Sequence, residues 1–230
     1  MFKKAFATAA AILAVFALST CYTADTAPTV ISTLEGRPPS DAIVLFDGSG
    51  LAEWEQTDGA APTWTVKNGS LTVSKGPIKT KREFGDLQIH LEFSLPAPPK
   101  GKDQDRGNSG IYIQGNYEVQ ILDSYENETY YDGQCGAIYK IAPPLVNANR
   151  PPGLWQTYDI IFRAPVIDAK GSVTKKANVI VLQNGVLVQD HVEVVPTGGR
   201  MGSTESAKGP IMLQDHNHPV KFRNIWVREL

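Results

Sequence analysis

Alternating apolar and polar residues dominate the chain from about residue 41 onward. In segment 85–94 the apolar side chains of Leu87, Ile89, Leu91 and Phe93 fall on one side, and polar side chains fall on the other. A period of two predicts a strand with one face in a core. The other predicted strands are 42–46, 64–67, 70–73, 111–113, 117–121, 155–163, 177–183, 186–193, 209–214 and 220–227.

Two Asn-Gly pairs mark tight turns between predicted strands. Asn68-Gly69 and Asn184-Gly185 each separate two apolar-polar segments, which is the strongest short-range hairpin signal. No stretch beyond the first 20 residues keeps a helical period of 3.6. Many strands at hairpin spacing predict an all-β sandwich of two antiparallel sheets.

Residues 107–125 hold the densest group of candidate functional side chains. Segment 117–121 places Tyr117, Val119 and Ile121 on one face and puts Glu118 and Gln120 on the other. The polar face is either a solvated outer surface, which is common for such strands, or a site. Nearby polar and aromatic residues favour a site: Asn108, Tyr112, Asp123 and Tyr125.

Residues 215–218, Asp-His-Asn-His, place a carboxylate and two imidazoles in a turn between predicted strands. The functional interpretation is a general acid, a general base or a metal ligand. The alternative is a solvated turn that Asp215 and Asn217 form through their own backbone. A metal site needs about three ligands in a suitable geometry, and the spacing alone does not reveal them.

The long irregular segment 124–153 is a candidate binding rim, because loops of this length are uncommon in compact domains. Tyr139 within it, and Trp155 and Tyr158 just after it, are candidates for stacking on sugar rings. Core packing is the more common role of such aromatic residues.

Length and charge narrow the class of protein. A chain of 230 residues accommodates one domain with a sizeable core. A net charge of −2 without any basic run predicts no nucleic-acid partner.

The N-terminus has the features of an export signal. Lys3 and Lys4 precede an apolar run over 5–18 that is too short to span a membrane. Residues 1–20 are therefore expected to be a signal peptide, and 21–40 a flexible spacer before a domain at 41–230. Segment 18–21, Leu-Ser-Thr-Cys, is similar to a bacterial lipobox, although cleavage after Ser19 is also open. We expect lipidation at Cys21 and a periplasmic or outer-membrane lipoprotein, with membrane contact only through that anchor.

Several longer motifs resemble the 3-keto-disaccharide hydrolase family, also called domain of unknown function 1080. In order they are 45–48 with Trp54, 107–112, 117–123, 136–139, 155–158, 184–186, 209–216 and 222–226. The resemblance covers nearly all of 43–230. It implies a concanavalin A-like jelly-roll sandwich and cleavage of 3-keto-glycosides, with some members acting as lyases or hydratases. The chain departs from the family at Asn217-His218, where a glycine is common, and at Cys135.

The resemblance implies a hydrolase whose chemistry starts at a ketone on C3 of the sugar. The ketone acidifies the hydrogen on C2, so a base generates an enolate that expels the glycosidic oxygen from C1, and water then adds. Glu118 and His216 are the candidate base and acid, in either order. The candidate substrate-binding residues are Asn108, Gln120, Asp123, Tyr139, Trp155, Asp215 and Arg223. No cofactor is assigned, but Asp215 could orient His216 or ligate a divalent metal.

Two other functions compete with this interpretation. A retaining glucanase would need two carboxylates about 5–5.5 Å apart, and Gln120 interrupts the acidic alternation. A non-catalytic, lectin-like carbohydrate-binding module would use the same fold without chemistry. Both share with the main hypothesis a small carbohydrate as the partner.

Overall fold

The computed structural model describes residues 27–197 and 204–230. The chain divides into residues 1–31 and a compact unit from Ser32 to Leu230, and every strand among the described residues belongs to the second. The expected signal peptide and the lipidation site at Cys21 lie outside the described residues. Within the described ranges, no helix is long and apolar enough to cross a membrane.

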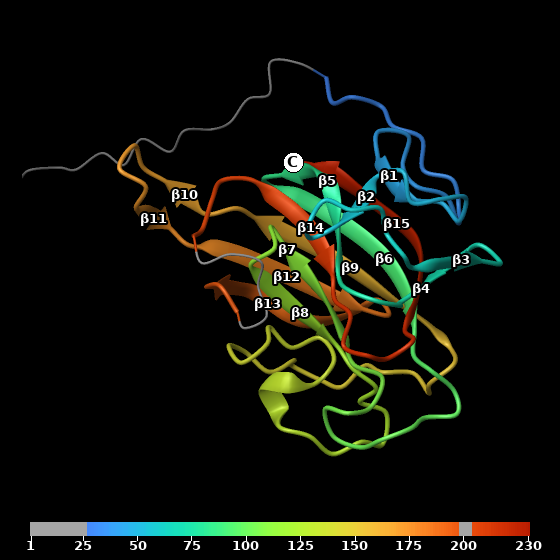
Figure 1. Cartoon of the computed structure of the whole chain (residues 1–230). Coiled ribbons are helices and arrows are strands. Elements are labelled where there is room, and N and C mark those ends of the chain that lie inside the picture. The colour runs from blue at the N-terminus through green and yellow to red at the C-terminus, as the bar shows by residue number, and fades with distance from the viewer. Residues whose placement is uncertain (1–26, 198–203) are drawn as a thin grey trace, which may run out of the picture. The chain divides into compact units, whose positions relative to one another are not determined.

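The compact unit contains two antiparallel sheets (Figure 1), which confirms the predicted sandwich. The eight-stranded sheet, called sheet A, has the order β13-β12-β9-β6-β15-β4-β3, and β1 pairs with β15. Its strands are β1 (Ile43–Phe46), β3 (Thr65–Lys67), β4 (Ser70–Thr72), β6 (Leu87–Ser94), β9 (Trp155–Arg163), β12 (Ala177–Gln183), β13 (Val186–Val194) and β15 (Lys221–Glu229).

The five-stranded sheet, called sheet B, has the order β2-β5-β14-β7-β8. Its strands are β2 (Trp54–Gln56), β5 (Ile78–Phe84), β7 (Ser109–Ile113), β8 (Tyr117–Ile121) and β14 (Gly209–Leu213). A separate two-stranded ribbon pairs β10 (Val166–Ile167) with β11 (Val173–Lys175), and the 3-10 helix η1 covers Tyr131–Gly133.

The core lies between the sheets because the apolar positions of the alternating strands face one another. Ile89 and Leu91 on β6 are fully buried, as is Ile121 on β8. Tyr117 of sheet B packs against Phe162 of sheet A with ring centroids 5.4 Å apart. Burial of apolar surface on this scale is the main force that holds two sheets together.

Both Asn-Gly hairpins form as predicted. Asn68 and Gly69 have φ values of 51° and 70°, and they connect β3 to β4. Asn184 and Gly185 have φ values of 54° and 79°, and they connect β12 to β13. Positive φ at both central residues is what a two-residue turn of the favoured twist requires.

Two long loops, 95–108 and 122–154, gather at one end of the sandwich (Figure 1). They are joined by hydrogen bonds, such as Gln104 Nε2 to Thr129 Oγ1 at 2.7 Å and Asn127 Nδ2 to the Asp103 carbonyl at 3.0 Å. These bonds give the irregular segments a fixed conformation beside the ends of β7 and β8.

Part of the second loop pairs with the open edge of β8. Tyr139 N donates to the Glu118 carbonyl at 3.2 Å, and Gly136 N donates to the Gln120 carbonyl at 3.0 Å. The sequence indicated that Glu118 and Gln120 face away from the core, and they do. They are nevertheless buried, with exposed fractions of 3% and 1%, because residues 136–139 and the neighbouring loops cover this face.

Candidate functional site

A cavity of about 220 Å³ lies on the outer face of sheet B. Residues from β7, β8, the 136–139 segment and the end of β14 line it: Asn108, Tyr112, Glu118, Gln120, Tyr139, Gln214 and His216. Five of them were predicted from the sequence as site residues: Asn108, Glu118, Gln120, Tyr139 and His216. Together the seven lining residues supply three amides, two phenol hydroxyls, one carboxyl group and one imidazole.

Gly110 makes room for the carboxyl group of Glu118. It lies on β7 next to Tyr112, which is directly opposite Glu118 on β8. A Cβ atom at position 110 would come within 2.5 Å of Glu118 Oε1, closer than real Cβ contacts allow. The glycine in this strand is therefore required by the position of the neighbouring carboxyl group.

The electrostatic environment of Glu118 differs strongly from that of a surface carboxylate. Burial raises the pKa of Glu118 from 4.5 to about 8, and a hydrogen bond from Tyr112 opposes part of this rise. Loss of solvation disfavours the charged form of a carboxyl group. A carboxyl group whose pKa lies near neutrality is suited to exchanging protons during a reaction.

Tyr112 was noted in the sequence as a neighbour that favours a site but was given no role, and Gln214 was not singled out; both line the cavity. Gln214 Nε2 donates to the Tyr112 hydroxyl at 3.2 Å, and its Oε1 atom is buried without a partner among the described residues. Burial, followed by the proximity of Glu118, raises the pKa of Tyr112, so its hydroxyl stays protonated. Tyr112 lies directly opposite Glu118 in the hairpin of β7 and β8. The alternation in the sequence could therefore have placed Tyr112 on the same outer face as Glu118.

His216 lies at the exposed end of the cavity. Its ring is parallel to that of His218, with centroids 5.9 Å apart. The predicted orientation of His216 by Asp215 is not observed, because the partners of the Asp215 carboxylate are backbone N–H groups. This carboxylate accepts hydrogen bonds from Gly76 N at 2.9 Å and from Asn217 N at 2.8 Å. Asp215 and Asn217 thus form the turn, and this turn presents the imidazole of His216 to the cavity.

Two of the three amide residues of the cavity, Asn108 and Gln120, are connected through Gln104. Asn108 Nδ2 donates to the Gln104 carbonyl at 2.9 Å, and Gln120 Nε2 donates to Gln104 Oε1 at 3.1 Å. Because Gln104 also donates to the Gly133 carbonyl at 3.0 Å, this network fixes both loops and the cavity wall together.

Tyr139 forms the wall opposite the β14 end and is oriented by two neighbours. Its hydroxyl lies 2.7 Å from the Tyr130 hydroxyl, and Lys140 Nζ lies 3.2 Å from the centre of the Tyr130 ring. The Tyr139 backbone is also bound to β8, as described above. The Tyr139 side chain is thereby positioned at the cavity.

Four predicted substrate-binding residues do not line this cavity. Asp123 is bound to Arg106 Nε at 2.8 Å in an adjacent cavity, and Asp215 lines a hollow beyond the 215–219 turn. Trp155 and Arg223 lie on sheet A, where the Arg223 guanidinium is 4.1 Å from the centre of the Trp155 ring. The Arg223 guanidinium is also paired with Glu92, at 2.7 Å.

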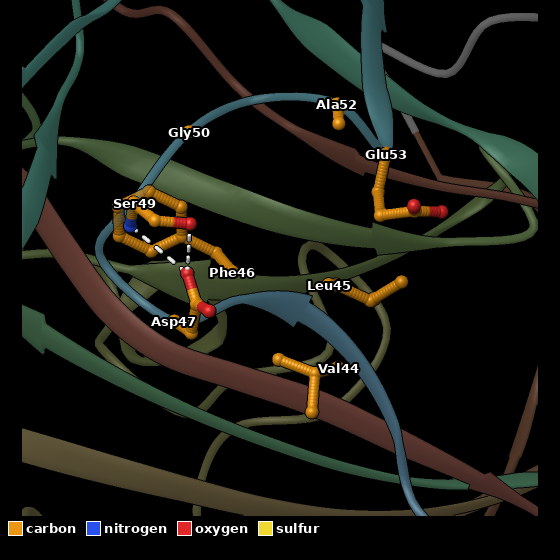
Figure 2. A pocket seen from close by; sticks show the side chains of 8 residues that line it. All are labelled: Val44, Leu45, Phe46, Asp47, Ser49, Gly50, Ala52 and Glu53. Carbon is orange, nitrogen blue, oxygen red and sulfur yellow. Dashed lines mark hydrogen bonds between the residues drawn. The ribbon is translucent and has the colours of Figure 1, made fainter.

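A further hollow of about 210 Å³ lies beside β1 (Figure 2). Figure 2 shows Asp47 turned toward Ser49, whose backbone N and Oγ donate to Asp47 Oδ1 at 2.9 and 2.6 Å. These bonds close a local turn, so the Asp47 carboxylate is engaged within its own loop, and Glu53 is the other carboxylate residue that lines the hollow. In the described part of the chain, no three His, Cys, Asp or Glu side chains form a group that could hold a metal ion.

A buried carboxyl group, hydroxyls, amides and an imidazole thus surround a small cavity on an all-β sandwich. The family model of the 3-keto-alpha-glucoside-1,2-lyase-like domain matches residues 41–228. The chain therefore belongs to this family, as its motifs indicated.

Solved structures agree with this assignment. A protein of Parabacteroides distasonis ATCC 8503, described as a "putative glycosyl hydrolase", is 45% identical, with a TM-score of 0.84 over 91% of this chain and 95% of its own. A second protein with that description, from the same organism, is 18% identical, with a TM-score of 0.61 over 83% of this chain and 94% of its own, and shows the fold alone. A search of curated proteins finds no match to this chain.

Proposed function

We propose that this protein cleaves the glycosidic bond of 3-keto-glycosides by elimination across C1 and C2 of the sugar, followed by addition of water. The observation that carries the proposal is the buried carboxyl group of Glu118 in the same cavity as His216. The family name supports the substrate class. A cavity of about 220 Å³ is smaller than the ~300–1,000 Å³ of typical ligand pockets, which fits a single sugar ring.

Glu118 is the base in this proposal. Its carboxylate takes the proton from C2, and the electron pair forms an enolate with the C3 ketone. Because burial raises the pKa of Glu118 to about 8, its carboxylate is a stronger base than an ordinary one and better matched to a carbon acid. The Tyr139 hydroxyl is the candidate donor to the enolate oxygen.

His216 is the acid in this proposal. As the enolate collapses, the bond between C1 and the glycosidic oxygen breaks, and the imidazole gives a proton to the leaving oxygen. The exposed position of His216 allows the ring to regain a proton from solvent. Water then adds to C1 and releases one proton to solvent, while Glu118 returns the proton to C2, so the net reaction is hydrolysis.

The composition of the cavity argues against a retaining glucanase. Such an enzyme places a second carboxylate about 5–5.5 Å from the first. Glu118 is the one carboxyl group among the seven lining residues, and the nearby Asp215 carboxylate is occupied by two backbone N–H groups.

The test is incubation with a 3-keto-glucoside and with its unoxidised parent, with products identified by mass. We expect cleavage of the ketone alone, because only the ketone acidifies C2. Cleavage of both substrates would indicate an ordinary glycosidase. Binding of either sugar without cleavage would favour the lectin-like module.

We also propose that the enzyme acts outside the cytoplasm as a lipoprotein. The proposal rests on Lys3, Lys4, the apolar run 5–18 and the setting of Cys21. Labelled palmitate should enter the wild type and not Cys21→Ala. Equal labelling of both, or of neither, would contradict the anchor.

A further inference from the structure

A second cavity, of about 370 Å³, lies directly beside the Glu118 cavity. Gly107 lines the second cavity and Asn108 the first. Likewise, His218 lines the second cavity and His216 the first. The parallel rings of His216 and His218 therefore lie along the boundary between the two spaces. This cavity is larger than the first and is not used by the chemistry proposed above.

The lining of the second cavity is unlike that of the first. Its apolar part consists of Ala97 and four proline rings, those of Pro96, Pro98, Pro99 and Pro219. Saturated rings of this kind present flat C–H surfaces, which pack well against the face of an aromatic ring. Asn217 is the one amide residue among the lining residues, and no hydroxyl lines this space, so apolar groups make up more of its surface than hydrogen-bonding groups do.

The charged residues of the second cavity divide into a fixed pair and a free cation. Arg106 donates to Asp123 at 2.8 Å, to the Tyr125 carbonyl at 3.1 Å and to the Glu126 carbonyl at 3.2 Å. Lys100 is exposed and has no hydrogen-bond or ion-pair partner within residues 27–197 and 204–230. A free ammonium group near an aromatic face is attracted by its π electrons.

The position of the acid relates the second cavity to the reaction. The glycosidic oxygen joins the keto sugar to the leaving group, and His216 must reach this oxygen to protonate it. When the sugar ring occupies the Glu118 cavity, the leaving group continues past His216. The space on that side, beyond the histidine pair, is the proline-lined cavity.

We propose that the proline-lined cavity binds the leaving group of the substrate and that it selects an aromatic aglycone over a second sugar. This proposal rests on the proposed function, because it needs a substrate with a leaving group at C1. It goes further in naming the chemical class of that group and the residues that recognise it.

The experiment compares benzyl and methyl 3-keto-glucosides, whose leaving alcohols have similar acidity and differ by a phenyl ring. Transfer of the phenyl ring from water into the cavity stabilises the bound benzyl substrate. We therefore expect kcat/KM to be higher for the benzyl substrate by about tenfold or more. In Pro99→Trp, which narrows the cavity, the ratio between the two substrates should fall toward one. Ser74→Trp is the matched control in the neighbouring hollow, and it should keep the ratio.

The outcomes separate the two proposals. Equal kcat/KM for both substrates in the wild type overturns the aglycone site and leaves the proposed function standing. Cleavage of neither substrate overturns both. A ratio that persists in Pro99→Trp and collapses in Ser74→Trp assigns the leaving group to the other hollow and overturns the proposal. A 3-keto-disaccharide that is preferred over the benzyl substrate overturns the aromatic selectivity.

If Pro99→Trp does not fold, Lys100→Trp at an exposed position of the same cavity replaces it. Unfolding temperatures are measured for every variant, so that a loss common to both substrates is recognised as a folding defect.

Discussion

Two polar sheet faces of this molecule look alike in sequence and differ in the structure. On sheet B the face with Glu118 and Gln120 is covered by a loop and encloses a cavity. On sheet A the face with Glu92 and Arg223 forms a chain of mutual contacts. Arg223 is paired with Glu92, and Asn224 Nδ2 donates to Glu92 Oε1 at 3.0 Å.

The sheet A face continues the same way at its other end. His90 Nδ1 lies 2.7 Å from Asp159 Oδ1, and the His90 ring stacks on Trp226 at a centroid distance of 5.0 Å. Its charged groups thus satisfy one another. In the sheet B cavity, by contrast, the carboxyl group is desolvated and Gln214 Oε1 has no partner among the described residues. The difference indicates that a polar face becomes a site where loops exclude water and leave polar groups unsatisfied.

The largest expected effect is the loss of turnover in Glu118→Gln, which preserves the shape of the side chain and removes the base. Loss of a positioned base lowers the rate by ~10²–10⁴. In the wild type, the part of the kcat profile that rises with pH should have its midpoint near pH 8, because Glu118 must lose its proton to act as the base. Steady-state rates on a 3-keto-glucoside between pH 5 and 10 measure both. A profile without a rising part near pH 8 would contradict the assignment of Glu118 as the base.

A smaller effect is expected from Gly110→Ala. This substitution disturbs the sheet B face that carries Glu118 and leaves the polar face of sheet A unchanged. The new methyl group would overlap Glu118 Oε1, so the carboxyl group must move. We expect a stability loss of about 1–3 kcal/mol and at least about a tenfold drop in turnover. Gly50→Ala is the matched control, since a Cβ there meets nothing within 4 Å. Equal behaviour of the two variants in urea unfolding and turnover would contradict the packing argument.

The raised pKa of Glu118 also predicts how stability depends on pH. Between pH 4.5 and about 8 the unfolded chain releases this proton while the folded protein keeps it. The free energy of unfolding of the wild type should therefore fall with rising pH in this window, relative to Glu118→Gln. The difference should grow by at most about 1.4 kcal/mol per pH unit. Urea unfolding at pH 5, 7 and 9 measures it, and parallel curves for the two proteins would refute the shift.

The smallest effect is expected on sheet A. Arg223 is 42% exposed, and its contacts with Glu92 and Trp155 are those of a surface residue. Arg223→Ala should cost about 1 kcal/mol or less of stability and leave kcat/KM within about twofold. A turnover loss as large as that of Glu118→Gln would show that sheet A takes part in the reaction.

Much of the fold could be predicted from local patterns. The period-two segments and the two Asn-Gly turns correctly indicated antiparallel strands, because turn chemistry and alternation act over a few residues. The burial of Glu118 could not be predicted, because it depends on residues 136–139 pairing with β8 from a distant part of the chain. For the same reason the sequence grouped Trp155 and Arg223 with the site, although they lie on sheet A.

The most direct test of the central claim follows the hydrogen on C2, with an analogue whose C1 substituent is attached through carbon. This analogue cannot lose its substituent, so proton transfer is observed alone. In D₂O the wild type should exchange the C2 hydrogen, and the C4 hydrogen of the same molecule serves as the internal control. Glu118→Gln should not exchange it above the buffer rate, whereas His216→Ala should. Exchange by Glu118→Gln at the wild-type rate would contradict the account.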